Sequence, residues 1–82
     1  MYKNKALDGR NNICGSKIRQ LRLALPGKPS QRKFADMLQL VGLDVDKNAI
    51  QRIESGERFI TDIELVKIAD VLGVSLDELL KE

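Results

Sequence analysis

Apolar side chains recur every three or four residues along most of the chain beyond residue 12, which is the period of a helix with one buried face. Four stretches carry this pattern, over residues 13–25, 30–42, 46–56 and 61–73, and a short leucine-rich stretch follows over 75–80. No alternation of period two is long enough for a strand. The sequence therefore predicts an all-α protein with five helices. Their apolar positions are Cys14, Ile18, Leu21 and Leu25; Phe34, Ala35, Leu38 and Val41; Ile50 and Ile53; Leu65, Ile68, Ala69 and Leu72; and Leu76, Leu79 and Leu80.

Local signals mark where the first three helices begin and end. Pro26-Gly27 ends the first helix, Ser30 can cap the second with its hydroxyl, and Gly42 follows the second. Asp46 is a good N-cap for the third helix because its carboxylate can accept from the unbonded amides of the first turn. Gly56 follows where a left-handed C-terminal residue would stand.

The last two predicted helices share one start signal. In each, a hydroxyl residue is followed three positions later by glutamate, which makes a capping box, and two apolar residues flank the box as a hydrophobic staple. Gly73 ends the first of the two. The boxes are Thr61 with Glu64 and Ser75 with Glu78, and the staples are Ile60 with Leu65 and Val74 with Leu79.

The length of 82 residues suits one domain with a modest core. Only Tyr2, Phe34 and Phe59 are aromatic, so we expect an aliphatic core, with Phe59 packed into it. Residues 1–12 are polar and have no periodicity, which predicts a flexible N-terminal arm. The expected organisation is this arm followed by one folded domain over 13–82.

The net charge of +2 conceals an uneven distribution along the chain. Residues 1–52 hold eleven Lys and Arg against four Asp and Glu, whereas residues 53–82 hold three against eight. The first part could therefore face phosphate, while the second faces water or a protein partner.

The residue types exclude the common catalytic and metal sites. The chain has one cysteine, Cys14, and no histidine, so neither an internal disulfide nor a tetrahedral Cys/His site can form. We expect Cys14 to be a small apolar filler at the start of the first helix. No cofactor, metal or enzymatic activity is expected. With no secretory signal and no window of membrane-spanning length, we expect a cytoplasmic, nucleoid-associated protein without a membrane partner.

The third helix has the composition of a DNA recognition helix. Its apolar side is limited to Ile50 and Ile53, and polar residues with base-contacting chemistry occupy the other sides. Such a short helix needs other elements to cover its apolar face. The alternative interpretation is a short core helix whose polar face is merely solvated. The polar residues are Lys47, Asn48, Gln51 and Arg52.

The second and third helices, joined through Gly42 to Val45, form a predicted helix-turn-helix. In that motif the first helix crosses the DNA backbone and the second enters the major groove. Gln31 lies in the first turn of the second helix, where amides and the helix dipole favour a phosphate contact. The expected phosphate contacts are Lys17, Arg19, Gln31, Arg32 and Arg58.

Four motifs in this order resemble the Cro/repressor-type helix-turn-helix family, also called the xenobiotic-response-element (XRE) family, of bacterial and phage transcription regulators. The matching segments are Ile18–Arg22, Ser30-Gln31 with Phe34-Ala35, Ile50–Gly56 and Leu65–Leu79. The resemblance covers roughly residues 13–80 and implies a compact five-helix, lambda-repressor-like DNA-binding domain. The stretch between Ala35 and Ile50 is longer than in the shortest members, which resembles a long-turn subgroup.

The resemblance also implies roles for individual residues. It places Arg22 and Glu54 in a structural ion pair that ties the first helix to the recognition helix. Ala49 would contact a thymine methyl, and Gln51 a base or the backbone. The implied base-contacting set is Lys47, Asn48, Ala49, Gln51 and Arg52.

The predicted function is sequence-specific binding of double-stranded DNA by a transcriptional regulator, with repression favoured. The operator is expected to be palindromic if the protein forms a homodimer. Leu76, Leu79 and Leu80 could either close the core or meet a second subunit. The alternative function is a protein-binding module of the same fold, antitoxin-like or anti-regulator, that uses the acidic surface of residues 53–82.

Overall fold

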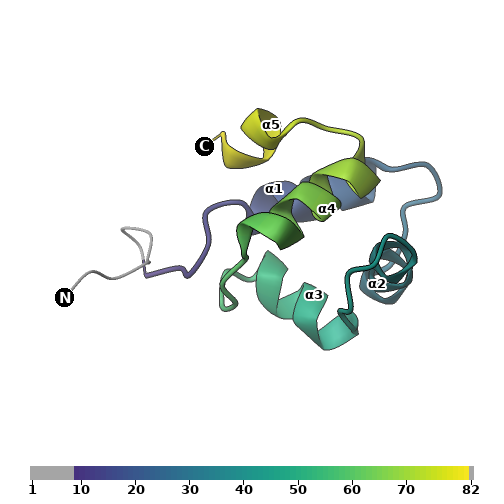
Figure 1. The fold of residues 1–82 in the computed structure, drawn as a ribbon, viewed down its shortest axis with the longest axis horizontal. Helices are drawn as coiled ribbons and strands as arrows, with labels where there is room; N and C mark the ends of the chain where they lie inside the picture. Colours follow the sequence, from purple (N-terminus) through teal and green to yellow (C-terminus); the bar gives the residue numbers. More distant parts are fainter. Residues whose placement is uncertain (1–8, 82) are drawn as a thin grey trace.

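The computed structural model describes residues 9–81 and contains, in this range, five helices and no strand. The all-α prediction is confirmed, and every helix lies within the stretch predicted for it. Figure 1 shows α3 and α5 on opposite sides of α4. The helices are α1 (Gly15–Ala24), α2 (Gln31–Leu40), α3 (Lys47–Glu54), α4 (Asp62–Leu72) and α5 (Leu76–Leu80).

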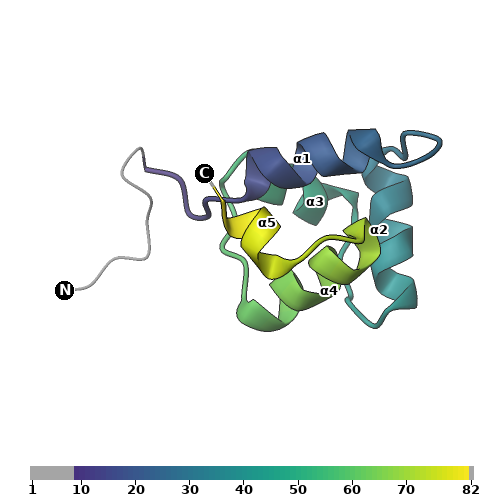
Figure 2. The same cartoon turned by 90° about the horizontal axis from the view of Figure 1, so that it is seen from above.

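One core joins the helices. α3 packs against both α1 and α2, and α4 packs against α2 and α5. Figure 2, turned from the first view, shows α1 along one edge of the domain and α4 along the opposite edge. Burying a large aliphatic or aromatic side chain contributes about 1.5–3 kcal/mol, so this cluster supplies most of the stabilisation. Its largest fully buried members are Ile18, Phe34, Leu38, Ile50, Ile53, Ile68 and Leu79.

The predicted caps operate at four helix starts, those of α2, α3, α4 and α5. Ser30 Oγ accepts from Lys33 N at 3.1 Å, and the Thr61–Glu64 capping box is complete in both directions. At α5, Ser75 Oγ accepts from Glu78 N at 3.2 Å, but the Glu78 carboxylate lies 3.6 Å from Lys17 Nζ of α1. Only one half of the predicted second capping box is therefore present: Ser75 caps the helix, whereas the Glu78 side chain pairs with Lys17 of α1.

Two apolar positions differ from the prediction. Phe59 was expected in the core, but it is 52 % exposed. Ile60, the staple residue before the Thr61 cap, packs against the core instead. Neighbouring side chains on an extended backbone point to opposite sides, which turns Phe59 outward. Val41 is 41 % exposed because α2 ends at Leu40 and Val41 serves as its C-cap.

Most of the predicted N-terminal arm, residues 1–8, lies outside the described residues. Its last two residues are attached to the domain. Asn11 N donates to Gly56 O at 2.8 Å, and the Asn12 side-chain amide donates to Ile53 O and Arg58 O at 3.1 and 2.8 Å. Asn11 and Asn12 thus belong to the packed structure and not to a free arm.

Within residues 9–81, no helix combines the length and the apolar character that crossing a membrane requires.

Candidate nucleic-acid interface

α3 presents one buried face and one exposed polar face. Ile50 and Ile53 are each 1 % exposed, and they fix the helix against the core. Ala49 is half-buried against the same core. The exposed residues recur with helical spacing and therefore form a continuous polar stripe along α3. They are Lys47, Asn48, Gln51 and Arg52.

α2 and α3 form the predicted helix-turn-helix, with residues 41–46 as the connection. Gly42 has a φ of 89°, a left-handed conformation that favours glycine, and it lets the chain turn directly after α2. Leu43 and Val45 of the connection are buried, at 9 % and 4 % exposure. The connection is thus held by apolar packing as well as by its hydrogen bonds.

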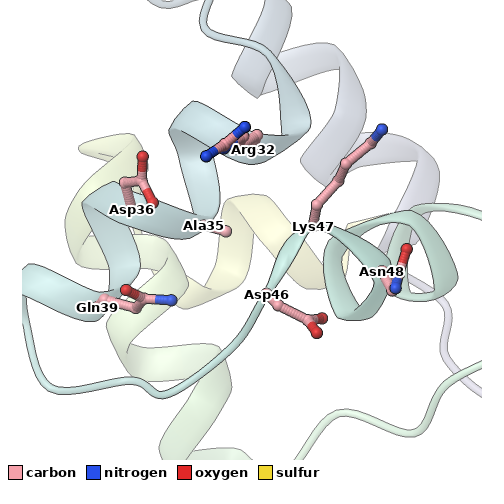
Figure 3. Close-up of a pocket in the computed structure, with 7 residues that line it drawn as sticks. All are labelled: Arg32, Ala35, Asp36, Gln39, Asp46, Lys47 and Asn48. Carbon is pink, nitrogen blue, oxygen red and sulfur yellow. The ribbon is translucent and has the colours of Figure 1, made fainter.

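A groove separates α2 from the start of α3 (Figure 3). Arg32 of α2 and Lys47 of α3 supply positive charge on its two sides, and both are exposed. A DNA strand that approached this side would meet both cations, the carboxylates of Asp36 and Asp46, and the polar stripe of α3 together. The residues that line the groove are Arg32, Ala35, Asp36, Gln39, Asp46, Lys47 and Asn48.

The amino end of α3 is fixed by two polar contacts. Asp46 Oδ1 accepts from Ala49 N at 2.8 Å, the N-cap that the sequence predicted. Gln39 Nε2 of α2 donates to Val45 O at 2.8 Å, just before the cap. Gln39, Asp46 and the first residue of α3, Lys47, are all exposed.

The carboxyl end of α3 is fixed by a buried charge network. Glu54 Oε2 and Oε1 lie 2.7 and 3.0 Å from Arg22 Nε and Nη2 of α1, and the two side chains are only 3 % and 7 % exposed. Arg22 Nη1 also donates to Pro29 O at 2.8 Å, and Gln31 Nε2 donates to Glu54 Oε1 at 3.1 Å. One carboxylate therefore joins α1, the start of α2 and the end of α3.

α1 meets the end of α3 with a backbone-to-backbone approach at Gly15. A Cβ atom on Gly15 would collide with the Ile53 carbonyl oxygen and lie 3.0 Å from that of Glu54. Asn12 Oδ1 accepts from Gly15 N at 2.8 Å, while the Asn12 amide bonds Ile53 O. These contacts fix where α1 and α3 touch.

Arg58, expected to contact phosphate, forms an ion pair in the loop after α3. Its Nη2 and Nη1 lie 2.7 and 3.0 Å from the carboxylate oxygens of Glu64 on α4. These hydrogen bonds, partly opposed by burial, hold the pKa of Glu64 below its ordinary value and raise the pKa of Arg58. The guanidinium edge suited to a bidentate phosphate contact is thus already occupied.

The two cations of α1 in the expected set lie on different sides of the helix. Arg19 is four residues after Gly15 and three before Arg22, so it shares the side that touches α3. Lys17 lies on the side of α5, next to Glu78. The structure therefore brings Arg19, but not Lys17, toward the recognition helix.

Cys14 is the N-cap residue of α1 and is 3 % exposed. Burial raises the pKa of its thiol, so the group stays protonated at neutral pH and fills apolar space. Across the described part of the chain, His, Cys, Asp and Glu side chains make no group of three or more that could hold a metal ion.

Sequence reasoning missed four residues that position the interface. Gln39 bonds the connection, Asn12 and Gly15 join α1 to the end of α3, and Lys67 Nζ of α4 donates to Val41 O at 2.8 Å. Gly15 carried one weak signal, since a glycine has no Cβ and so permits the close approach of another backbone. The other three are ordinary polar residues whose partners only the fold supplies.

The connected pair of helices, with a polar stripe on the second and a groove of charged residues between them, defines the helix-turn-helix class of DNA-binding proteins. The chain belongs to the helix-turn-helix family, whose model matches residues 18–79. This is the XRE type that the sequence motifs resembled, a class of DNA-binding transcription regulators.

Among solved structures, the chain is similar to the restriction-modification controller protein C.AhdI from Aeromonas hydrophila. The two sequences are 28 % identical, the match covers 79 % of this chain and 84 % of that one, and the TM-score is 0.65. A comparison with curated proteins gives no match.

Proposed function

We propose that this protein is a transcriptional repressor that binds a specific double-stranded DNA sequence with α3 in the major groove. The observation that carries the proposal is the polar stripe of α3, which is exposed beside the groove that Arg32 and Lys47 flank, while the opposite face of the helix is buried. The similarity to a restriction-modification controller protein supports a regulatory role. Repression is the simplest outcome, because a bound domain blocks other proteins from the same DNA.

Residues of α3 divide into two kinds of base contact. Lys47, Asn48, Gln51 and Arg52 carry the donors and acceptors that suit base edges in the major groove. Ala49, half-buried beside them, offers only a methyl group, which suits contact with a thymine methyl. Glu54 is excluded from base contact, because its carboxylate is engaged by Arg22 and Gln31.

Phosphate contacts would flank α3 on both sides. Arg32 lies across the groove on α2, and Arg19 is exposed on the side of α1 nearest α3. The first backbone amides of α2, beginning at Gln31, offer a helix N-terminus to a phosphate. We leave Lys17 and Arg58 out of the proposed set, because each pairs with a glutamate, Glu78 and Glu64 respectively.

Two copies on a palindromic operator form the second part of the proposal. Ile68, Ala69 and Leu72 face the core from α4, which leaves Ile63 and Val66 outward at 67 % and 48 % exposure. In the proposed dimer, these two residues and Phe59, which is 52 % exposed just before α4, would form the apolar surface that a second copy covers. Leu79 is fully buried and belongs to the core.

Selection of bound duplexes from a random DNA pool, followed by titration of the best site at several salt concentrations, tests the function. We expect an enriched sequence and a steep salt dependence of affinity. The Lys47→Ala/Arg52→Ala double variant should lose the preference for that sequence, whereas Lys81→Ala, on the α5 side, should keep it. Absence of any enriched sequence would reject the proposal in favour of the protein-binding module.

Sedimentation equilibrium tests the dimer independently of DNA. Ile63→Glu should convert a dimer into a monomer, because it buries a charge in the proposed interface. Leu40→Glu is the matched control, since Leu40 is 87 % exposed at the end of α2, outside the proposed surface. Equal masses for wild type and Ile63→Glu would remove α4 as the dimer surface.

A further inference from the structure

The first turn of α3 has weaker support than the rest of the helix. Lys47 and Asn48 are exposed, and the first fully buried residue of α3 is Ile50. The placement of these two side chains therefore depends on how residues 41–46 enter the helix. Leu43 and Val45 hold this entry by apolar packing, and polar contacts at its two ends add to that hold.

Two side chains hold carbonyl oxygens at the two ends of the connection. Lys67 Nζ of α4 donates to Val41 O at 2.8 Å, and Gln39 Nε2 of α2 donates to Val45 O at 2.8 Å. Among the residues that the structure describes, Gln39 makes the one side-chain hydrogen bond from α2 to residues 43–46. Val45 directly precedes the N-cap Asp46, so this bond acts next to the first turn of α3.

The Gln39 bond also lies in the groove that faces the proposed DNA. Gln39 lines this groove together with Arg32 and Asp36 on one side and Lys47 and Asn48 on the other (Figure 3). Gln39 is exposed in the protein alone, so water competes for its amide. When DNA covers the groove and excludes water, the same bond becomes stronger and the entry of α3 more rigid.

We infer that Gln39 is a positioning residue for sequence discrimination: its bond to Val45 O sets where the first turn of α3, with Lys47 and Asn48, meets the bases. This inference rests on the proposed DNA-binding function. It assigns Gln39 no base or phosphate contact of its own. Losing the bond should therefore impair discrimination at the base pairs nearest the first turn, and leave the remaining contacts intact.

Gln39→Met tests this inference, because methionine has a similar length and helix propensity but no donor. Gln20→Met, at an exposed glutamine of α1, is the matched control. For each protein, the affinity for the best duplex is compared with that for duplexes changed at single base pairs. Lys47→Ala identifies the pairs that the first turn contacts, and Arg52→Ala those that the last turn contacts.

For Gln39→Met, the preference at the first-turn base pairs should fall by about three- to ten-fold, the loss expected for one hydrogen bond. The preference at the last-turn pairs, the salt dependence and the Tm should match those of Gln20→Met. An unchanged preference, or equal weakening at all base pairs with a lowered Tm, would overturn the inference. If the wild-type protein selects no DNA sequence, the proposed function itself is wrong. If it selects one and Gln39→Met leaves the preference unchanged, only the role of Gln39 is wrong.

Discussion

The two ends of α3 are fixed by different kinds of contact. At the carboxyl end, Glu54 lies buried between Arg22 and Gln31, and Gly15 of α1 touches the backbone directly. At the amino end, the hydrogen bonds of Asp46 and Gln39 are exposed to water. Losing a contact at the carboxyl end should therefore destabilise the protein strongly. Losing one at the amino end should cost little, because water can replace it. The stability of the fold and the placement of the proposed base-contacting residues are therefore supported by separate groups.

The largest effect is expected at the buried carboxyl end. Glu54→Gln should lower the free energy of unfolding by about 3–5 kcal/mol, because it leaves the Arg22 guanidinium buried without a charge partner. Urea denaturation measures the loss. The double variant Arg22→Met/Glu54→Leu should recover much of it, since an apolar pair of similar size often replaces a buried ion pair without cost. A loss below about 1 kcal/mol for Glu54→Gln, the value of an exposed ion pair, would show that the carboxyl end of α3 is not fixed by a strong buried contact.

Gly15→Ala tests the close approach of α1 to the same end. Alanine normally favours a helix over glycine, but here its Cβ would collide with the Ile53 carbonyl oxygen. We expect a net loss of about 1–3 kcal/mol, the range for overpacking, measured by thermal and urea unfolding. Ser16→Ala, at the next and exposed residue of α1, should change stability little. A stabilised Gly15→Ala protein would show that the helices can separate without penalty.

At the amino end, Asp46→Ala should cost about 1 kcal/mol of stability, the typical value of an N-cap. Its bond to Ala49 N is exposed, so water can replace part of the lost interaction. Asp44→Ala, at another exposed aspartate of the connection, is the control. If the two variants had equal free energies of unfolding in urea, the Asp46 cap would contribute no stability to the amino end of α3.

The smallest effect concerns the more exposed ion pair after α3. Hydrogen bonds from Arg58 lower the pKa of Glu64 in the folded protein, so Glu64 contributes stability above its ordinary pKa of 4.5. This contribution is lost as the pH falls through the lower, folded pKa. The stability difference between wild type and Glu64→Gln should thus be about 1 kcal/mol or less at pH 7 and should vanish in acid.

Glu64→Gln is a conservative change, since glutamine can also complete the capping box with Thr61. Unfolding measured from pH 7 down to pH 3 checks the prediction. A stability difference that grew toward low pH would show that the sign assigned to the Glu64 shift is wrong.

Much of the fold could be predicted from short-range sequence patterns. The period of the apolar residues located all five helices, and Ser30, Asp46 and Thr61 marked helix starts that the structure shows. The outward position of Phe59 could not be predicted from the sequence, because a large aromatic residue is expected in the core. Only the geometry of the loop, with Ile60 turned inward, decides which of the two neighbours is buried.

The candidate site could be predicted in part from the sequence. The exposed stripe of α3 followed from the spacing of Ile50 and Ile53, since everything off that face must meet solvent or a partner. Which cations accompany it did not follow from the sequence. The four charged residues of the expected set are all cations, but Lys17 and Arg58 have Glu78 and Glu64 within reach, and Lys17 also lies on the α5 side of α1.

By itself, the sequence determined the helices, most of their ends and the polar face of α3, because a helix and its caps depend on residues within about four positions of one another. The tertiary structure alone decided which residues hold α3 in place. Arg22 and Glu54 are 32 positions apart, and Asn12 bonds carbonyls 41 and 46 positions away. Contacts over such separations exist only after the helices have packed. Packing likewise decides which cations gain a carboxylate partner and which stay exposed to meet DNA.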